Sequence, residues 1–277
     1  MEFAKLQATG NDFIVVDARQ LEQDWTELAC AMCDRHFGVG ADGLLLVLKS
    51  DLADFRMRMF NPDGSEAEVC GNGLRCLARY AIDYGLFDKK KQELTIETIA
   101  GIRDVKSCGI DQFQVNMGLP RFRPEDIPVS INPVDIIPIL DYPININDTE
   151  LLLSFVSLGN PHGVCFLEKP VTDFPLSELG PIIEHHSSFP RRLNFEVANV
   201  LSRKEVRVRV WERGAGETLG CGSGACAVAI MAGLHDYVDS PVNIVLPGGI
   251  LNVEWDGKGQ AYLRGDAELV FNGNWLG

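Results

Sequence analysis

An internal repeat of about 150 residues constrains this chain more than any other feature of its sequence. The segment RMRMFNPDGSEAEVCGNG, which contains Cys70, aligns with the segment around Cys221 at a constant shift of 151 positions. At this shift Glu66 meets Glu217, and the glycines that follow each cysteine also coincide. Because a fixed period indicates a repeated structural unit, the sequence predicts two related halves, each with one cysteine in a glycine turn.

The repeat extends beyond the cysteines in both directions. Upstream, GNDFIVV (10–16) parallels GNPHGVC (159–165), and downstream, TIETIAGI (95–102) parallels NIVLPGGI (243–250). These segments keep the same order, and their shifts of 149 and 148 positions lie close to the shift at the cysteines. Such agreement favours a duplicated fold over a chance match.

The hydrophobic patterns indicate strands with a central helix in each half. FRMRMF and VRVRVW alternate apolar and polar residues, which is typical of antiparallel strands with one solvated face. GLRCLARYAIDYGL and GACAVAIMAGLHDYV follow the glycine turns and are predicted helices, and the second is apolar nearly all round, so we expect protein to surround it. Shorter helices are predicted at 26–35 and 175–185. The predicted strands cover residues 13–16, 44–48, 55–60, 94–97, 112–117, 164–167, 206–211, 242–246, 251–254 and 261–263.

These patterns predict an α/β (α+β) fold with two pseudo-symmetric domains, each a mainly antiparallel β-structure wrapped around a central helix. Residues 118–149 are rich in proline and contain the expected crossing between the domains.

The charge balance restricts the class of partner. The chain has 39 acidic and 25 basic residues, a formal net charge of −14, which argues against nucleic acid and anionic membranes. No apolar run approaches the roughly 20 residues that cross a bilayer. The sequence has eight cysteines and no recognisable secretory signal, so we expect a reducing, cytoplasmic location. A small molecule remains the expected partner.

The chemistry expected of the matched cysteines follows from their place at a helix start. Unpaired N–H groups and the helix dipole there predict a lowered thiol pKa and a binding place for a carboxylate. If a pseudo-two-fold axis brings both helix starts to one cleft, a thiolate and a thiol can face one carbon atom from opposite sides. One then removes a proton and the other delivers one, which inverts a stereocentre.

Other classes of protein fit the motifs less well. GCGSGA (220–225) satisfies a dinucleotide-binding pattern, but no strand ends directly before it and the acidic residue expected at the end of a following strand is absent. The C-x-x-C of Cys30 and Cys33 has no second pair at zinc-binding spacing. A thiol-based redox protein, with a regulatory disulfide between Cys70 and Cys221, would leave the nearby asparagine and arginine residues without a purpose.

The motifs together resemble the diaminopimelate epimerase family over essentially the whole chain. They are TGNDFIVVDA, FNPDGSEAEVCGNGLRC, LGNPHGV, ERGAGETLGCGSGAC and LPGGIL. The resemblance implies that the chain converts L,L-2,6-diaminopimelate to the meso isomer without a cofactor, in lysine and peptidoglycan precursor biosynthesis. It implies a first domain of residues 1–118 plus 266–277, in which DAELVFNG is a returning strand, and a second domain of residues 119–265.

The resemblance also implies the roles of individual residues. Cys70 and Cys221 would be the paired acid and base, and His162 and Glu212 would tune the thiols. The implied substrate-binding residues are Asn11, Asn61, Gly71, Asn72, Asn160, Asn194, Glu212, Arg213, Gly222 and Ser223. One position departs from the pattern: some relatives have glutamine where GVGADGLL has Gly43, so no site residue is expected there.

Three questions stay open at the level of the sequence. An epimerase or racemase for another amino acid would use the same pair of thiols, and the distal residues would choose its substrate. The sequence does not decide which thiol serves which stereoisomer. It is compatible with a homodimer without deciding whether one forms.

Overall fold

The chain forms two compact units. The computed structural model describes residues 1–67, 70–88, 91–109, 111–131, 136–147 and 149–277. Unit 1 consists of Met1–Asn116 and Arg264–Gly277, and unit 2 consists of Met117–Leu263. The division falls within two strands, β8 (Gln112–Gly118) and β17 (Ala261–Asp266), so the chain passes between the units twice.

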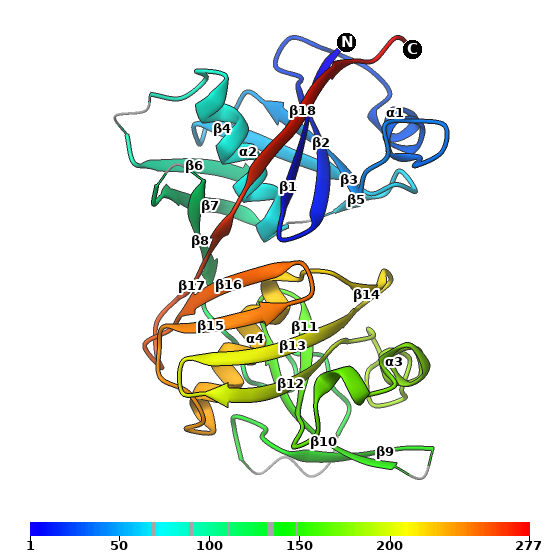
Figure 1. Ribbon diagram of the computed structural model, residues 1–277, viewed down its shortest axis with the longest axis vertical. Coiled ribbons are helices and arrows are strands. Elements are labelled where there is room, and N and C mark those ends of the chain that lie inside the picture. The colour runs from blue at the N-terminus through cyan, green and yellow to red at the C-terminus, as the bar shows by residue number, and fades with distance from the viewer. Residues whose placement is uncertain (68–69, 89–90, 110, 132–135, 148) are drawn as a thin grey trace. The chain divides into compact units, whose positions relative to one another are not determined.

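Unit 1 surrounds helix α2 (Gly71–Asp83) with strands (Figure 1). The strands β2 and β3 pair in parallel, as do β4 and β6. The antiparallel pairs are β1–β18, β1–β2, β3–β4, β4–β5, β6–β7 and β7–β8. A shorter helix, α1 (Trp25–Cys33), packs on β3 and β4. Besides the first part of β8, the strands are β1 (Glu2–Ala8), β2 (Asn11–Asp17), β3 (Gly43–Leu48), β4 (Phe55–Phe60), β5 (Glu66–Ala67), β6 (Glu93–Thr98), β7 (Gly101–Ser107) and β18 (Glu268–Asn274).

Unit 2 repeats this arrangement around helix α4 (Gly222–Leu234). The parallel pairs are β11 with β12 and β13 with β15. Helix α3 (Leu176–Glu184) and the short 3₁₀ helix η1 (Val171–Asp173) pack on β12 and β13. Besides most of β17, the strands are β9 (Tyr142–Ile146), β10 (Thr149–Ser157), β11 (Pro161–Phe166), β12 (Asn194–Ser202), β13 (Glu205–Glu212), β14 (Gly216–Thr218), β15 (Val242–Leu246) and β16 (Gly249–Glu254).

The two units match element by element. Helices α1 and α3 have nine residues each, α2 and α4 have thirteen each, and both pairs are separated by 151 positions. The parallel pairs β2–β3 and β11–β12 also start at equivalent residues, since Phe13 lies opposite Gly43 and His162 lies opposite Asn194. The predicted class is therefore confirmed: a mixed α/β chain with two pseudo-symmetric halves and a helix at the centre of each.

The central helices end earlier than their sequence patterns predict. Helix α2 stops before Gly85, whose φ is +65°, and the N–H of Leu86 bonds to the carbonyl of Ala81. Helix α4 stops before Asp236, whose φ is +56°, and the N–H of Tyr237 bonds to the carbonyl of Ala232. A left-handed residue with this bond closes a helix, so the apolar residues beyond it belong to the following turn.

Helix α4 is buried nearly all round, as its sequence indicates. Nearly all residues of α4 from Gly222 to Ala232 are buried, and α4 lies at the centre of a core formed with β10, β11, β12, β13, β15 and β16.

The returning strand predicted near the C-terminus is β18, which pairs antiparallel with β1. Its Phe271 ring meets Phe3 edge to face, with centroids 6.1 Å apart.

The sequence patterns fail to predict several of the strands. Strand β10 contains the run LSFVS (153–157) and β12 contains NFEVAN (194–199), both buried on both faces, so burial does not alternate along them. Strand β7, GIRDVKS, is mostly polar and is held by its pairing with β6 and β8. A fully buried strand and a mostly solvated strand both lack the alternation that reveals a half-buried one.

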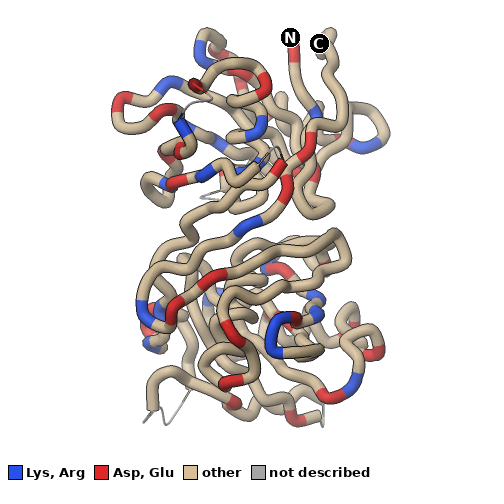
Figure 2. Tube along the Cα trace, turned by 60° about the vertical axis from the view of Figure 1, so that its left-hand side comes forward, with Lys and Arg blue, Asp and Glu red and all other residues tan. Residues whose placement is uncertain are grey.

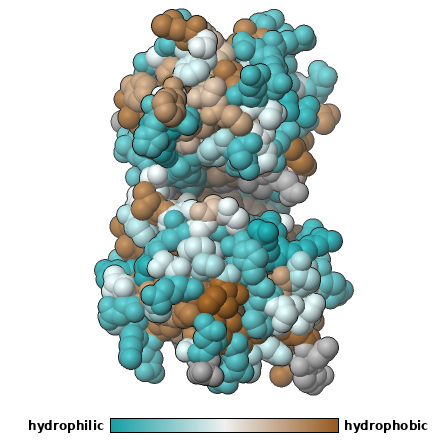
Figure 3. All heavy atoms as spheres, turned by 90° about the vertical axis from the view of Figure 1, so that its right-hand side faces the viewer, coloured by the Kyte–Doolittle hydropathy of each residue, from teal (hydrophilic) through white to brown (hydrophobic). Residues whose placement is uncertain are grey.

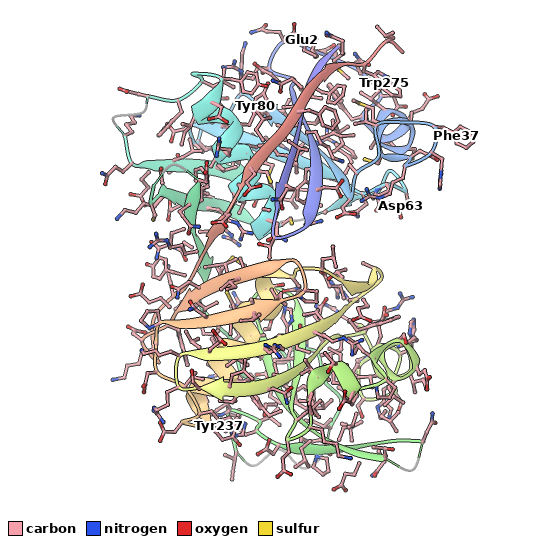
Figure 4. The ribbon with its side chains drawn as sticks, viewed as in Figure 1. Glu2, Phe37, Asp63, Tyr80, Tyr237 and Trp275 are labelled. Carbon is pink, nitrogen blue, oxygen red and sulfur yellow. The ribbon has the colours of Figure 1, made fainter. Side chains whose placement is uncertain are left out.

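The surfaces of the units carry mixed chemistry. Acidic and basic residues are interspersed along the trace of each unit (Figure 2). Hydrophobic residues lie scattered among hydrophilic ones on the face shown in Figure 3. Phe37, which is 92% exposed, points away from the ribbon of unit 1 (Figure 4). None of the helices in the described ranges is long and apolar enough to span a membrane.

Replacement of Gly180 by alanine is expected to destabilise the chain, because helix α3 approaches Trp211 closely at this glycine. An added Cβ would lie 2.4 Å from Cδ2 of the indole. We expect Gly180→Ala to lower the free energy of unfolding by roughly 1–3 kcal/mol, as overpacking does.

A matched control is Gly233→Ala, because Gly233 is also helical and an added Cβ there meets nothing within 4 Å. This change is expected to be neutral or to stabilise by up to about 1 kcal/mol. Urea unfolding followed by circular dichroism measures both variants, and equal effects would contradict the packing explanation.

Candidate active site

Cys70 caps the start of helix α2. Its backbone is extended, with φ −140° and ψ 118°, and its Sγ accepts a hydrogen bond from the N–H of Gly73 at 3.4 Å. The thiol also donates to Oδ1 of Asn11 at 3.9 Å. The sulfur therefore lies beside the first turn of the helix, where the peptide N–H groups and the dipole favour an anion.

Cys221 caps helix α4 in the same way. Its φ is −117° and its ψ is 114°, and its Sγ accepts from the N–H of Gly224 at 3.4 Å. The hydroxyl of Ser223 lies 3.5 Å from the sulfur. Each unit thus presents one sulfur on a helix start with the same backbone geometry, and the residues Gly71–Asn72 and Gly222–Ser223 open the two helices.

A chain of oriented amides surrounds Cys70. Asn72 donates from Nδ2 to Oδ1 of Asn11 at 3.2 Å, and Asn11 donates from Nδ2 to the carboxylate of Asp42 at 2.7 Å. The buried guanidinium of Arg75 donates to Oδ1 of Asn72 at 2.9 Å. Because a carboxylate only accepts and a guanidinium only donates, Asp42 and Arg75 set which end of each amide faces inward.

Gly43 and Asn61 both lie beside the end of β4. A Cβ on Gly43 would lie 3.0 Å from the carbonyl oxygen of Phe60. Asn61, at the end of β4, donates from Nδ2 to Ser65 at 2.9 Å, and its N–H bonds to the carbonyl of Ser65. The same turn contains Asp63 and lies next to α1 (Figure 4). The side chain of Asn61 thus shapes the β4–β5 turn.

The polar groups near Cys221 form a longer chain. Asn160 donates from Nδ2 to the Ser223 hydroxyl at 3.2 Å, and its Oδ1 lies 3.0 Å from Nε2 of His162. Nδ1 of His162 lies 2.7 Å from Oε1 of Glu196, and both of these side chains are fully buried. The chain therefore runs from Glu196 on β12 to the sulfur at the start of α4.

Asn194 organises the loop that carries Arg213. Its Nδ2 donates to the carbonyl of Pro161 at 2.8 Å, and its Oδ1 accepts the N–H of Arg213 at 3.0 Å. The guanidinium of Arg213 reaches the carbonyl of Arg191 at 3.2 Å. The buried Glu184 holds the next residue of the loop, because it accepts the N–H of Gly214.

Burial and like charges govern ionisation in unit 2. Burial raises the pKa of Glu212, while hydrogen bonds from Thr218 and Cys221 and the nearby His162 oppose that rise. Burial also raises the pKa of Cys221 well above its ordinary value, and the charges of Glu212 and Glu196 raise it further. The lowered pKa that the helix start predicts is therefore wrong for Cys221: desolvation and two carboxylates outweigh the Ser223 and Gly224 hydrogen bonds.

Burial dominates the environment of several other cysteines. Burial raises the pKa of Cys76, and it raises the pKa of Cys33 to about 12 and that of Cys165 to about 11. No disulfide joins any of the eight cysteines, all of which lie in the described ranges. Among the residues whose placement is described, no three His, Cys, Asp or Glu side chains are grouped as metal ligands would be.

The sequence-based set lacks several residues of these networks, namely Asp42, Arg75, Glu184, Glu196 and Thr218. Asp42 precedes Gly43 in the GVGADGLL motif and Arg75 lies within CGNGLRC, so their positions inside quoted motifs were a usable signal. Glu196 lies inside a buried apolar strand, where a charged residue stands out only once its burial is known.

Solved structures place the fold in a known class. A phenazine biosynthesis protein of the PhzF family from Bacillus anthracis superposes with a TM-score of 0.72 at 20% identity, covering 100% of this chain and 99% of that one. A hydroxyproline epimerase from Agrobacterium vitis superposes with a TM-score of 0.70 at 14% identity, covering 99% and 91%. The fold is thus the two-domain α/β architecture of these proteins.

Sequence comparison identifies the family. The diaminopimelate epimerase model matches residues 3–123 and 154–270. The diaminopimelate epimerase of Moorella thermoacetica is 46% identical over 281 residues, and that of Methanococcus maripaludis is 43% identical over 279, each alignment covering 99% of both chains. The chain belongs to the diaminopimelate epimerase family, whose members are isomerases that act on an amino acid.

The raised pKa of Glu212 predicts how stability depends on pH. A carboxyl group with a raised folded-state pKa makes the ionised folded chain less stable, and this cost disappears as the pH falls and the group is protonated. Glu212→Gln carries no charge to desolvate and keeps a hydrogen-bonding partner for Thr218. We expect its urea midpoint to exceed that of the unchanged chain at pH 8, and we expect the gain to shrink toward pH 4. A gain of equal size at both pH values would contradict the assigned cause.

Proposed function

We propose that this chain interconverts L,L- and meso-2,6-diaminopimelate with Cys70 and Cys221 as a paired base and acid. The observation that carries the proposal is the matched pair of cysteine caps, each holding its sulfur at a helix start with a hydrogen bond of 3.4 Å. Family membership supports diaminopimelate as the substrate. The two thiols would act from opposite faces of one α-carbon.

The proposed step balances protons and electrons within the pair. The thiolate takes the α-proton and becomes a thiol, while the electron pair of the C–H bond spreads over the α-carbon and its carboxylate. The opposite thiol gives its proton to the other face and becomes a thiolate. The reverse reaction starts from that second thiolate, so the same two sulfurs serve both directions.

The helix starts would stabilise the charge that develops on the substrate. Peptide N–H groups of Gly71–Asn72 and Gly222–Ser223 are suited to bind the α-carboxylate, because donors already oriented at a helix start need no rearrangement during reaction. The same interaction favours the carbanion-like transition state over the substrate. This mechanism uses side chains and peptide groups as its only acid, base and electrostatic groups.

Distal residues would choose the substrate. We propose that Glu212 binds an ammonium group and that Arg213 binds a carboxylate, two groups that diaminopimelate carries at each end. His162 and Glu212 would tune the thiols through the contacts described above. The remaining proposed contacts come from Asn11, Asn61, Asn72, Asn160, Asn194 and Ser223.

We propose that the meso product feeds lysine and peptidoglycan precursor synthesis. The mechanism requires both sulfurs to stay reduced, which is consistent with a cytoplasmic location of the enzyme.

Loss of either thiol should abolish epimerisation. We expect Cys70→Ala and Cys221→Ala each to reduce kcat by about 10²-fold or more, the usual contribution of a positioned acid or base, while some substrate binding survives. Cys76→Ala is a matched control, because this thiol is buried in the same helix as the first cap. Conversion of L,L-diaminopimelate at the unmodified rate by either single variant would refute the two-thiol mechanism.

Isotope exchange tests the substrate. In D₂O, we expect deuterium to enter the α-carbon of both L,L- and meso-diaminopimelate and not of single-centre amino acids. Faster exchange into proline, hydroxyproline or another amino acid would instead assign the chain to a different racemase or epimerase specificity.

Activity should persist without added or bound cofactors. We expect protein treated with EDTA and with hydroxylamine, which removes pyridoxal phosphate, to retain its kcat. Strict dependence of the rate on restored metal or pyridoxal phosphate would overturn the cofactor-free mechanism.

A further inference from the structure

A buried couple in unit 2, His162 and Glu196, whose Nδ1 and Oε1 lie 2.7 Å apart, has an apolar counterpart in unit 1. In the matched strands, Phe13 takes the place of His162, and Leu45 takes the place of Glu196. The match extends to packing: a Cβ on Gly73 would lie 3.2 Å from Leu45, and a Cβ on Gly224 would lie 2.8 Å from Oε1 of Glu196. Because unit 1 builds the same framework from two apolar side chains, the framework itself does not require a histidine and a glutamate.

Burial makes this couple costly to keep. His162 and Glu196 have no exposed surface, and Oε2 of Glu196 lacks a hydrogen-bond partner in the part of unit 2 that the structure describes. A buried carboxylate oxygen without a partner destabilises a protein unless it serves another purpose. The neighbours of the couple indicate what that purpose is.

The couple is connected to the Cys221 sulfur through two neighbours. Nε2 of His162 faces Oδ1 of Asn160 and Nδ1 faces Oε1 of Glu196, so each ring nitrogen meets an acceptor. With Oδ1 turned to the ring, Asn160 donates from Nδ2 to Ser223, whose hydroxyl hydrogen is then available to the sulfur 3.5 Å away. Glu196 thereby fixes the orientation of the His162 ring, and this orientation sets the direction of the hydrogen bonds that lead to the thiol.

The carboxylate is also close enough to act on the sulfur directly. A Cβ on Gly224 would lie 2.8 Å from Oε1 of Glu196 and 3.4 Å from Sγ of Cys221, so both groups flank one glycine. The ionisable side chains around this sulfur come from three strands, His162 on β11, Glu196 on β12 and Glu212 on β13. Two of the three are carboxylates.

We infer that Glu196 is a positioning residue for Cys221: it orients the His162–Asn160–Ser223 chain, whose hydroxyl donor favours the thiolate, and its own charge beside the buried sulfur opposes that donor and favours the thiol form between turnovers. This role rests on the proposed two-thiol function. It means that Cys221, in the second half of the chain, is the protonated member of the pair between turnovers. The raised pKa of Cys221, in which burial is the largest cause and Glu196 a contributor, agrees with it.

Alkylation of the thiols as a function of pH tests this role without substrate. Iodoacetamide reacts with the thiolate, and peptide mass spectrometry reports Cys70 and Cys221 separately. Glu196→Gln keeps the shape and a hydrogen-bonding group but removes the charge. In this variant we expect the pH midpoint of Cys221 alkylation to fall by roughly one pH unit, the ordinary spread of pKa values in folded proteins. The pH midpoint of Cys70 alkylation should stay unchanged.

Two further variants complete the test. His162→Phe with Glu196→Leu transplants the unit 1 couple, so we expect it to fold and to lower the Cys221 midpoint as Glu196→Gln does. Glu184→Gln removes another buried carboxylate, which contacts Trp211 and Gly214, and should leave the Cys221 midpoint unchanged.

The outcomes separate this role from the proposed reaction. An unchanged Cys221 midpoint in folded Glu196→Gln and in the folded double variant would overturn it, whatever the epimerase activity. Failure of both variants to fold would assign the couple to structure and would overturn it as well. A lowered midpoint in protein that does not epimerise diaminopimelate would support the role of Glu196 and count against the proposed function alone.

Discussion

The hydrogen bond from the third helical N–H to a cysteine sulfur is the interaction on which the rest of this structure depends. It occurs twice, from Gly73 to Cys70 and from Gly224 to Cys221. Serine or aspartate caps helices more often, so a thiol in both equivalent places agrees with the acid–base role proposed for the two cysteines. Glycine at the third position leaves room for a neighbouring strand to approach, and strands β3 and β12 supply the side chains that occupy it.

Duplication supplies the frame, and divergence supplies the asymmetry. The helices and the parallel strand pairs of the two units agree in length and register. The amide network at the unit 1 sulfur, however, is held by the Arg75 guanidinium and the Asp42 carboxylate, whereas two carboxylates raise the pKa of the unit 2 sulfur. A reaction that needs one thiolate and one thiol benefits from such a difference. The lowered pKa expected from a helix start does not hold for Cys221, because burial and like charge are larger effects than the helix dipole.

Much of the fold could be predicted because its patterns are local. The helix starts, the apolar helix α4 and the alternating strands β4 and β13 follow from spacing alone. Strands β10 and β12 could not be predicted, since burial on both faces over most of their length removes the alternation of burial. The role of Asp42 in orienting Asn11, and of Asn194 in holding the Arg213 loop, depends on contacts between residues 31 and 19 positions apart.

The sequence by itself determined the duplication, the two cysteines in equivalent turns and the family, because these depend on residue identity and order. Only the tertiary structure decided the environment of each sulfur. Electrostatic effects depend on distance and burial, and the strands that carry His162, Glu196 and Glu212 reach Cys221 only after the chain has folded around α4. Two turns with nearly the same sequence therefore hold thiols with different surroundings.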